Sequence, residues 1–68
     1  MQRVPVSSSN IASVGYDDNT HTLEVEFHSG HVYQYFDVPK DVYDGLLTAG
    51  SVGKYFNQIK GFYRYARV

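Results

Sequence analysis

Polar and apolar residues alternate along residues 22–27, which is the pattern of a β-strand with one face in solvent and the other in the core. After the short segment 28–30, residues 31–36 are rich in the aromatic side chains that fit a pleated sheet. The pattern predicts a β-hairpin in the middle of the chain.

The tip of this hairpin sets its register, and two alternatives are open. A two-residue turn at Ser29 and Gly30 requires a positive φ at Ser29, which strains a serine. A three-residue loop requires a positive φ only at Gly30, which glycine adopts freely. We favour the loop, which buries Tyr33 and Tyr35 and leaves three residues on the polar face with Glu24 and Glu26: Val32, Gln34 and Phe36. The pairs are then Phe27 with His31, Val25 with Tyr33, and Leu23 with Tyr35.

Residues 11–16 alternate in the same way and predict an earlier strand, with Ala12, Val14 and Tyr16 on one face. Residues 17–20 have the Asp and Asn side chains of a tight turn. The first ten residues contain Pro5 and a serine run without periodicity, so we expect an extended, partly frayed lead-in there and a single domain over residues 11–68.

Beyond residue 38 the apolar spacing becomes helical. Pro39 suits the start of a helix, and Gly50 suits its end. Ser51 is a good N-cap for a second short helix that Gly61 ends. The residues that we expect to face the core are Val42, Tyr43, Leu46 and Leu47 in the first helix, and Tyr55, Phe56 and Ile59 in the second.

Alternation returns over residues 62–68, with Tyr63, Tyr65 and Arg67 on one side, and predicts a last strand. The order of elements is then β-β-β-α-α-β. We therefore predict a small α+β domain, an antiparallel β-sheet with two short helices packed on one face.

The chain has 68 residues and no cysteine, so it forms one domain without disulfides or thiolate metal sites. No run approaches the ~20 apolar residues of a membrane span, and the N-terminus lacks the pattern of a signal peptide. We expect a cytoplasmic monomer with no contact to a membrane.

Charge is divided unevenly along the chain. All seven acidic residues lie within the first 50 positions, whereas the remaining 18 carry only cations: Lys54, Lys60, Arg64 and Arg67. This asymmetry suggests a negatively charged partner for the C-terminal third. The alternative, which we favour on this observation alone, is that the basic segment is neutralised by the acidic hairpin beside it.

Seven short stretches keep an order and spacing that is specific as a set: 8–11, 14–17, 23–27, Gly30, 33–35, 38–39 and 51–57. From Val6 onward the chain resembles the KTSC domain, a module named for the C-terminal region of lysyl-tRNA synthetase. The module occurs there as an appendage and also as a single-domain bacterial or phage protein. The resemblance implies RNA as a partner.

Two constellations are candidates for catalysis or metal binding. His28 and His31 lie at the hairpin tip near Glu26, but a zinc site requires three or four protein ligands, and a third is not evident. Polar loop histidines are the alternative that we favour. Glu24 and Glu26 are a candidate acid/base pair about 7 Å apart, although surface carboxylates are the commoner cause of such spacing. We predict that the protein is not an enzyme and binds no metal or cofactor.

Ser51, Gly53 and Lys54 are a candidate anion site, because free N–H groups at a helix start lie beside a glycine and a lysine. The segment lacks the first glycine and the loop length of a phosphate-binding P-loop. Capping of the helix by Ser51 is the simpler alternative, and we favour it.

Residues 60–67 begin like the signature of an RNA-recognition motif, but most positions fail and the segment is at the end of the chain, so we reject that fold. Tyrosines that alternate with arginines can still stack bases and meet phosphates; half-buried sheet residues are the alternative. We hypothesise weak RNA binding through Lys54, Lys60, Tyr63, Arg64, Tyr65 and Arg67. The alternative is a protein-interaction module that uses its aromatic surface or a sheet edge.

Overall fold

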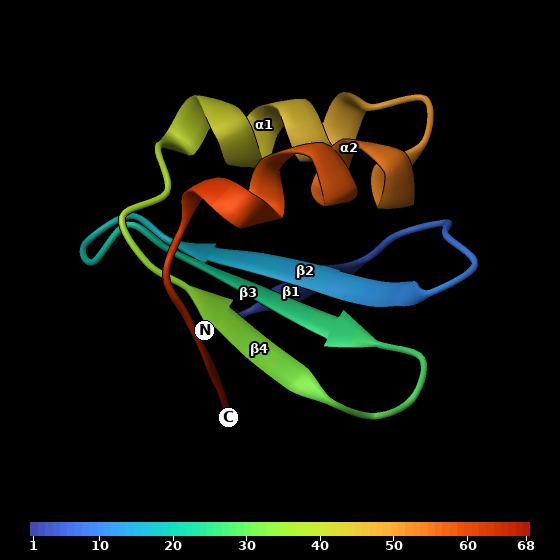
Figure 1. Cartoon of the computed structure of the whole chain (residues 1–68), viewed down its shortest axis with the longest axis horizontal. Helices are drawn as coiled ribbons and strands as arrows, with labels where there is room; N and C mark the ends of the chain where they lie inside the picture. The colour runs from blue at the N-terminus through green and yellow to red at the C-terminus, as the bar shows by residue number, and fades with distance from the viewer.

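The structure is a computed structural model that describes all residues from Met1 to Val68. Its strands are β1 (Arg3–Pro5), β2 (Ile11–Asp17), β3 (Thr22–Phe27), β4 (Val32–Tyr35) and β5 (Tyr65–Arg67). Its helices are α1 (Lys40–Thr48), α2 (Val52–Ile59) and the 3₁₀ turn η1 (Lys60–Phe62). The strands form one antiparallel sheet in the order β1-β2-β3-β4-β5, and both helices cover the same face of it (Figure 1). The α+β architecture is therefore confirmed.

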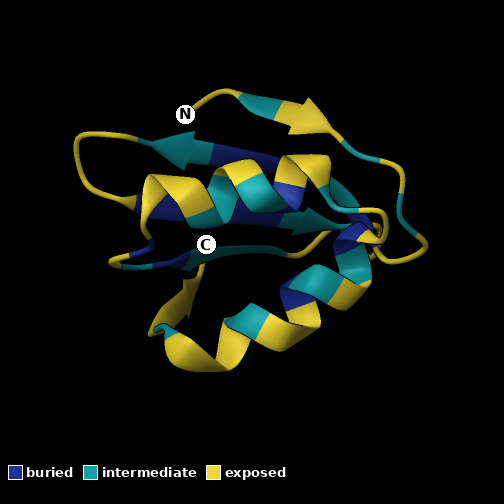
Figure 2. Cartoon of the chain, turned by 90° about the horizontal axis from the view of Figure 1, so that it is seen from above, coloured by how far each residue is buried: buried dark blue, intermediate teal, exposed yellow.

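The core lies between the sheet and the two helices. Figure 2 shows buried segments of the sheet beneath the helices, whose own buried residues are few. The core has nine residues: Ile11, Val14, Leu23, Val25, Tyr35, Val38, Leu46, Val52 and Phe56. The helices expose most of their remaining surface, so the domain has a single apolar layer.

The three-residue loop of the central hairpin is confirmed. The N–H of Phe27 donates to the carbonyl of His31 (2.9 Å), and Gly30 has a φ of 94°. Tyr33 and Tyr35 pair with Val25 and Leu23 as expected. Tyr35 is buried, and Tyr33 is half-buried toward the end of the sheet.

β2 carries a bulge that corrects the expected pattern of its first residues. Ile11 pairs with Phe27 and Ser13 with Glu26, so Ala12 is an extra residue in β2. A bulge of this kind shifts the alternation by one position. As a result Ile11 and Val14 both lie fully buried in the core, and the prediction that Ala12 shares the face of Val14 was wrong.

The N-terminal lead-in is extended, as expected, but it is a paired strand and not a frayed end. Arg3 in β1 lies opposite Gly15 in β2, which in turn lies opposite Glu24 in β3. A Cβ at Gly15 would lie 2.7 Å from the carbonyl oxygen of Gln2 and 3.0 Å from Cγ of Arg3. The missing side chain lets Arg3 cross β2 and donate to Glu24 Oε2 (2.7 Å).

This cross-strand contact also explains why Glu24 is buried on the polar face. Gln34 Nε2 donates to Glu24 Oε1 (2.9 Å) from the other side, and the residue is only 8% exposed. A buried carboxylate needs such donors, because the desolvation of an unpaired charge is costly. The polar face of the sheet is therefore a hydrogen-bonded layer.

Both helices begin as expected and Gly50 directly follows the C-cap of α1, but the buried stripe of α1 and the end of α2 differ from the prediction. α1 starts at Lys40 directly after Pro39, and the N–H of Lys54 donates to Ser51 Oγ (3.3 Å) at the start of α2. Leu47 is 42% exposed, so it does not belong to the buried stripe. Gly61 does not end α2, because the chain continues into η1 and Gly61 lies within that turn.

The last strand is shorter than predicted. Only residues 65–67 pair with β4, with Tyr65 opposite Tyr35 and Arg67 opposite Tyr33. Phe62 lies in η1 and is 80% exposed. β5 is thus an edge strand whose odd-numbered residues lie on the face that the helices cover.

Candidate binding cleft

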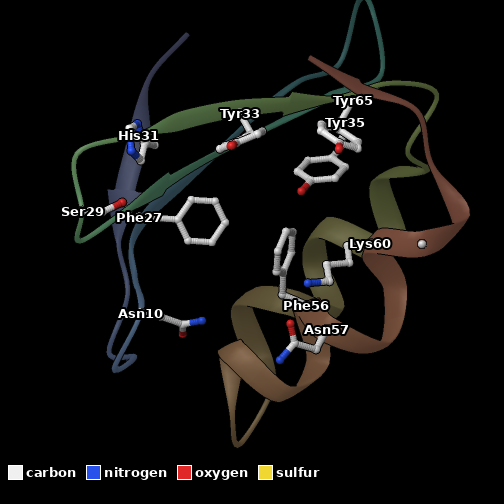
Figure 3. A pocket seen from close by; sticks show the side chains of 11 residues that line it. Asn10, Phe27, Ser29, His31, Tyr33, Tyr35, Phe56, Asn57, Lys60 and Tyr65 are labelled. Atoms are coloured by element: carbon white, nitrogen blue, oxygen red, sulfur yellow. The ribbon is translucent and has the colours of Figure 1, made fainter. Parts of the chain in front are cut away.

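A cleft of about 530 Å³ lies between α2 with η1 on one side and the β3–β4 hairpin with β5 on the other. We call it the aromatic cleft. It is lined by Asn10, Phe27, Ser29, His31, Tyr33, Tyr35, Phe56, Asn57, Lys60, Gly61 and Tyr65. Figure 3 shows side chains from the strands on one side of it, and Phe56, Asn57 and Lys60 from the helical side.

Five aromatic rings form the walls of the cleft, and they hold one another in place. Tyr35 packs edge to face against Phe56 at 5.3 Å between ring centroids, and Phe27 packs against Phe56 at 5.8 Å. Tyr65 lies 5.5 Å from Tyr35 and 5.8 Å from Tyr33. Such arrangements are favourable beyond the area that they bury. The rings therefore provide a largely preformed apolar surface.

The charge of the cleft is positive. Lys60 lines it, and no Asp or Glu does. At the rim, Arg67 Nη2 lies 2.6 Å from Nδ1 of His31, which also lines the cleft. Because a guanidinium can only donate, Nδ1 of His31 is the acceptor. Two cations thus stand beside the rings without a carboxylate between them.

Three tyrosine hydroxyls in the cleft have no acceptor in the protein. The hydroxyls of Tyr16 and Tyr55 donate to main-chain carbonyls elsewhere, whereas those of Tyr33, Tyr35 and Tyr65 make no such bond. Burial, with smaller effects from Tyr65 and Tyr33, raises the pKa of Tyr35 above its ordinary value. Its hydroxyl therefore stays protonated at neutral pH and can donate.

The structure brings together only part of the predicted nucleic-acid site. Lys60 and Tyr65 line the cleft, and Arg67 stands at its rim. Arg64 is on the opposite face of the sheet, where its Nη2 contacts Asp37 Oδ2 at 3.3 Å. Tyr63 packs against the core. Arg64 is therefore paired with an acidic residue of the protein itself, whereas Lys60 and Arg67 at the cleft are not.

Lys54 belongs to a separate, polar hollow between residues 7–10 and the start of α2. Ser51, Gly53 and Lys54 line this hollow, as the anion hypothesis requires. A Cβ at Gly53, however, would lie 3.0 Å from Asn10 Oδ1. The close approach that this glycine permits is therefore to the serine-rich loop of the protein itself, which favours packing and capping as its reason.

The candidate metal and acid/base residues all have structural partners. His28 Nε2 lies 2.9 Å from the carbonyl oxygen of Ser8, and Glu26 accepts a hydrogen bond from Ser13 Oγ (2.8 Å). No group of three or more His, Cys, Asp or Glu side chains is arranged to hold a metal ion. None of the helices has the length and apolar character to cross a bilayer.

The sequence did not predict the cleft as a site, although it placed several of its residues. Phe56 and Tyr35 were expected in the core, and both are buried there. Asn10 and Asn57 lie in two of the stretches that carry the family resemblance, but nothing in the sequence indicated that either amide lines a binding cleft. The cleft is assembled from residues of the hairpin, α2, η1 and β5, which are far apart in the sequence, and local periodicity does not report how such segments meet.

The fold and the cleft together define a small α+β domain with one aromatic, cationic recess. The chain belongs to the KTSC domain family, whose family model matches residues 7–65. It is similar to a KTSC domain protein from Yersinia pestis, whose crystal structure aligns with a TM-score of 0.95 and 40% identity over 98% of this chain and 96% of that one.

Proteins of two kinds are similar in sequence to this chain: a small protein of about the same length and a much longer enzyme. A protein of Stutzerimonas stutzeri described as uncharacterized is 47% identical over 70 aligned residues, which cover 100% of this chain and 99% of the relative. A lysine–tRNA ligase of Nostoc punctiforme is 43% identical over 61 residues, which cover 88% of this chain but only 11% of the ligase. The domain thus corresponds to a whole small protein in one case and to a small segment of an enzyme in the other.

Proposed function

We propose that the domain is a non-catalytic module that binds single-stranded RNA weakly at the aromatic cleft. One observation carries the proposal: Lys60 lies among five aromatic rings in a recess that no carboxylate lines. Rings accept unstacked bases and cations meet phosphates, and this combination is common in proteins that bind single strands. In this proposal the module acts as a cytoplasmic monomer.

The relatives support RNA as the nucleic acid. The segment of the Nostoc punctiforme protein that resembles this chain belongs to a lysine–tRNA ligase. The electrostatics of the cleft also favour an anionic partner, because Lys60 and Arg67 have no carboxylate within ion-pair distance. Both cations are thus free to meet phosphates.

The expected affinity is low. Two phosphate contacts to a single strand correspond to a slope of about −1.4 in a plot of log affinity against log salt concentration, since each contact contributes about −0.7. Binding of this strength is micromolar or weaker and declines at physiological ionic strength. Such weak affinity suits a domain that supplements the RNA contacts of other domains or partners.

A titration of the labelled protein with single-stranded oligoribonucleotides at low ionic strength tests this proposal. We expect the resonances of Lys60, Tyr65 and Arg67 to shift, and Lys60→Ala to weaken binding similarly for all sequences. Arg64→Ala is the matched control, because Arg64 is exposed on the opposite face beside Asp37. We therefore expect it to leave binding unchanged, although the sequence alone grouped it with Lys60.

Two results would contradict RNA binding at the cleft. One is a flat response of these resonances to every oligonucleotide. The other is an equal loss of affinity in Lys60→Ala and Arg64→Ala, which would indicate attraction by net charge alone.

A second candidate function, protein interaction through a sheet edge, rests on the outer edge of β5. The N–H of Phe36 donates to the carbonyl of Arg64, and the N–H of Val68 donates to the carbonyl of Val32. The main-chain polar groups of the even-numbered residues of this segment therefore face β4. The N–H and C=O groups of Tyr65 and Arg67 therefore point away from the sheet and can pair with an added strand. In this case affinity would depend little on salt, and the amides of β5 would shift more than the cleft rings.

A further inference from the structure

The hydroxyl of Tyr35 is unusual among the polar groups of the domain. Tyr35 is 94% buried, given its exposed fraction of 6%, yet its hydroxyl has no acceptor in the protein. No fully buried side-chain nitrogen or oxygen lacks a hydrogen-bond partner. It follows that the hydroxyl of Tyr35 is not fully buried, and Tyr35 is one of the residues that line the aromatic cleft. A polar group in this position is well placed to meet a ligand that enters the recess.

The chemistry of the walls restricts what that ligand is. The exposed ring of Tyr65 and the half-buried ring of Tyr33 favour a flat, π-rich group. A polar edge on that group would bond the Tyr35 hydroxyl. Aromatic recesses also bind organic cations, but Lys60 would repel a cation here. Asn57 adds an amide, which offers both donors and an acceptor to such an edge. A planar heterocycle linked to an anion meets all of these conditions.

The size of the cleft limits the occupant further. A volume of about 530 Å³ falls within the ~300–1,000 Å³ of small-ligand sites. Lys60 stands on the helical side of the recess, opposite the strand that carries Tyr35 (Figure 3). The cleft therefore has room for one base with its phosphate.

We propose that the aromatic cleft is a pocket for one unpaired nucleotide. The base stacks on the ring of Tyr65, which is 62% exposed, beside the half-buried ring of Tyr33. Its polar edge bonds the Tyr35 hydroxyl and the Asn57 amide. The phosphate meets Lys60. This inference deepens the proposed RNA binding and rests on it for the source of the nucleotide, but it makes the separate claim that one base enters the recess.

The common ribonucleoside 5′-monophosphates, titrated one at a time against the intact protein, test this claim. We expect at least one of them to shift the resonances of Tyr35, Phe56 and Lys60 in a saturable way. Ribose 5-phosphate, which has the phosphate but no base, should leave the ring resonances in place. Tyr35→Phe keeps the ring and removes the hydroxyl, so it should weaken mononucleotide binding by about two- to tenfold.

Tyr43→Phe is the matched control. Tyr43 stacks on Tyr16 away from the cleft, and its hydroxyl also makes no bond within the protein. We expect it to leave mononucleotide binding unchanged.

The outcomes separate the two claims. RNA binding without a response of the rings to any mononucleotide, and with no effect of Tyr35→Phe, would overturn the nucleotide pocket and leave RNA binding standing. No response to either RNA or mononucleotides would overturn both. Equal shifts with ribose 5-phosphate would show that phosphate alone is bound, which also overturns the pocket.

Discussion

At the scale of single residues, Tyr35 joins the core to the cleft. Its ring packs against Phe56 among the buried residues, and its hydroxyl opens to the recess. Stability and binding therefore depend on different atoms of one side chain. Comparing Tyr35→Phe, which removes only the hydroxyl, with Tyr35→Ala, which also removes the ring, separates the contribution to binding from the contribution to stability.

Replacement of the whole Tyr35 side chain should destabilise the fold. We expect Tyr35→Ala to lower the free energy of unfolding by ~3–5 kcal/mol, the range for buried aromatic truncations, because the contacts with Phe56 and Leu23 are lost. Chemical denaturation measures the change. Tyr35→Phe is the control and should retain most of the stability, so a comparable loss in both variants would contradict this division.

Gly30 allows a second test at the residue scale. Nothing lies within 4 Å of a Cβ built there, so any cost of substitution comes from its φ of 94° and not from crowding. We expect Gly30→Val to reduce the free energy of unfolding by at least ~1–2 kcal/mol. Gly50→Val is the control, because Gly50 also has open space around it but no positive φ. Equal stability of the two variants would count against backbone strain at the tip.

At the scale of elements, the sheet is protected at one edge and open at the other. The N–H of Val6 donates to the carbonyl of Ala12, so the main-chain groups of Val6 face β2. The nitrogen of the preceding Pro5 therefore faces away from the sheet, where the absence of an N–H breaks no hydrogen bond. Proline at an edge also discourages the pairing of further strands. β5 has no such device, which is why the two edges differ in what they can bind.

The contact across Gly15 predicts how β1 is held. Gly15→Ala places a methyl group 2.7 Å from a main-chain oxygen of Gln2, and we expect a loss of ~1–3 kcal/mol. Hydrogen exchange should show faster exchange of the Val6 amide, because β1 is displaced from β2. Gly50→Ala serves as control. Normal protection of Val6 in Gly15→Ala would mean that β1 shifts without releasing its pairing.

Elements whose structure is set by residues close in the sequence were predictable, and elements that depend on contacts with distant segments were not. The central hairpin follows from its alternation and from Gly30, and the start of α2 follows from Ser51. β1 is short, contains Pro5 and becomes a strand only because β2 lies beside it. The bulge at Ala12 shifts the faces of the residues before it, and no local residue type marks its position in the sequence. The cleft depends on how the hairpin, α2, η1 and β5 come together, which no single segment encodes.

At the scale of the whole molecule, ion pairs distribute the charges unequally. Arg3 pairs with Glu24, Lys40 with Asp44, and Arg64 with Asp37. The cations that remain without a carboxylate are Lys54, Lys60 and Arg67. An acidic protein thus keeps a positive surface near the cleft, and the position of each cation in the fold decides its role.

Tyrosine ionisation should make the stability of the domain fall at alkaline pH. Burial raises the pKa of Tyr16, Tyr35 and Tyr43 above the ordinary 10.0, with added effects of nearby acids at Tyr16 and Tyr43. The unfolded chain therefore releases these protons first. Their contribution is complete below pH 10 and is lost as the pH rises through the higher folded-state values. Denaturation curves at increasing pH, with tyrosinate absorbance, measure this loss; constant stability across that window would refute it.

The sheet follows the chain in strict order, each strand lying beside its predecessor, and this has a kinetic consequence. Pairing of β1 to β4 joins segments that are close in sequence, so the relative contact order of this part is low and it can form within the order of milliseconds. β5 alone pairs with a strand from which both helices separate it in the chain, so its pairing must close the longest loop of the sheet. Because β5 supplies Tyr65, the cleft is complete only when β5 has paired with β4, and a nascent chain can bind there only after residues 65–67 have emerged.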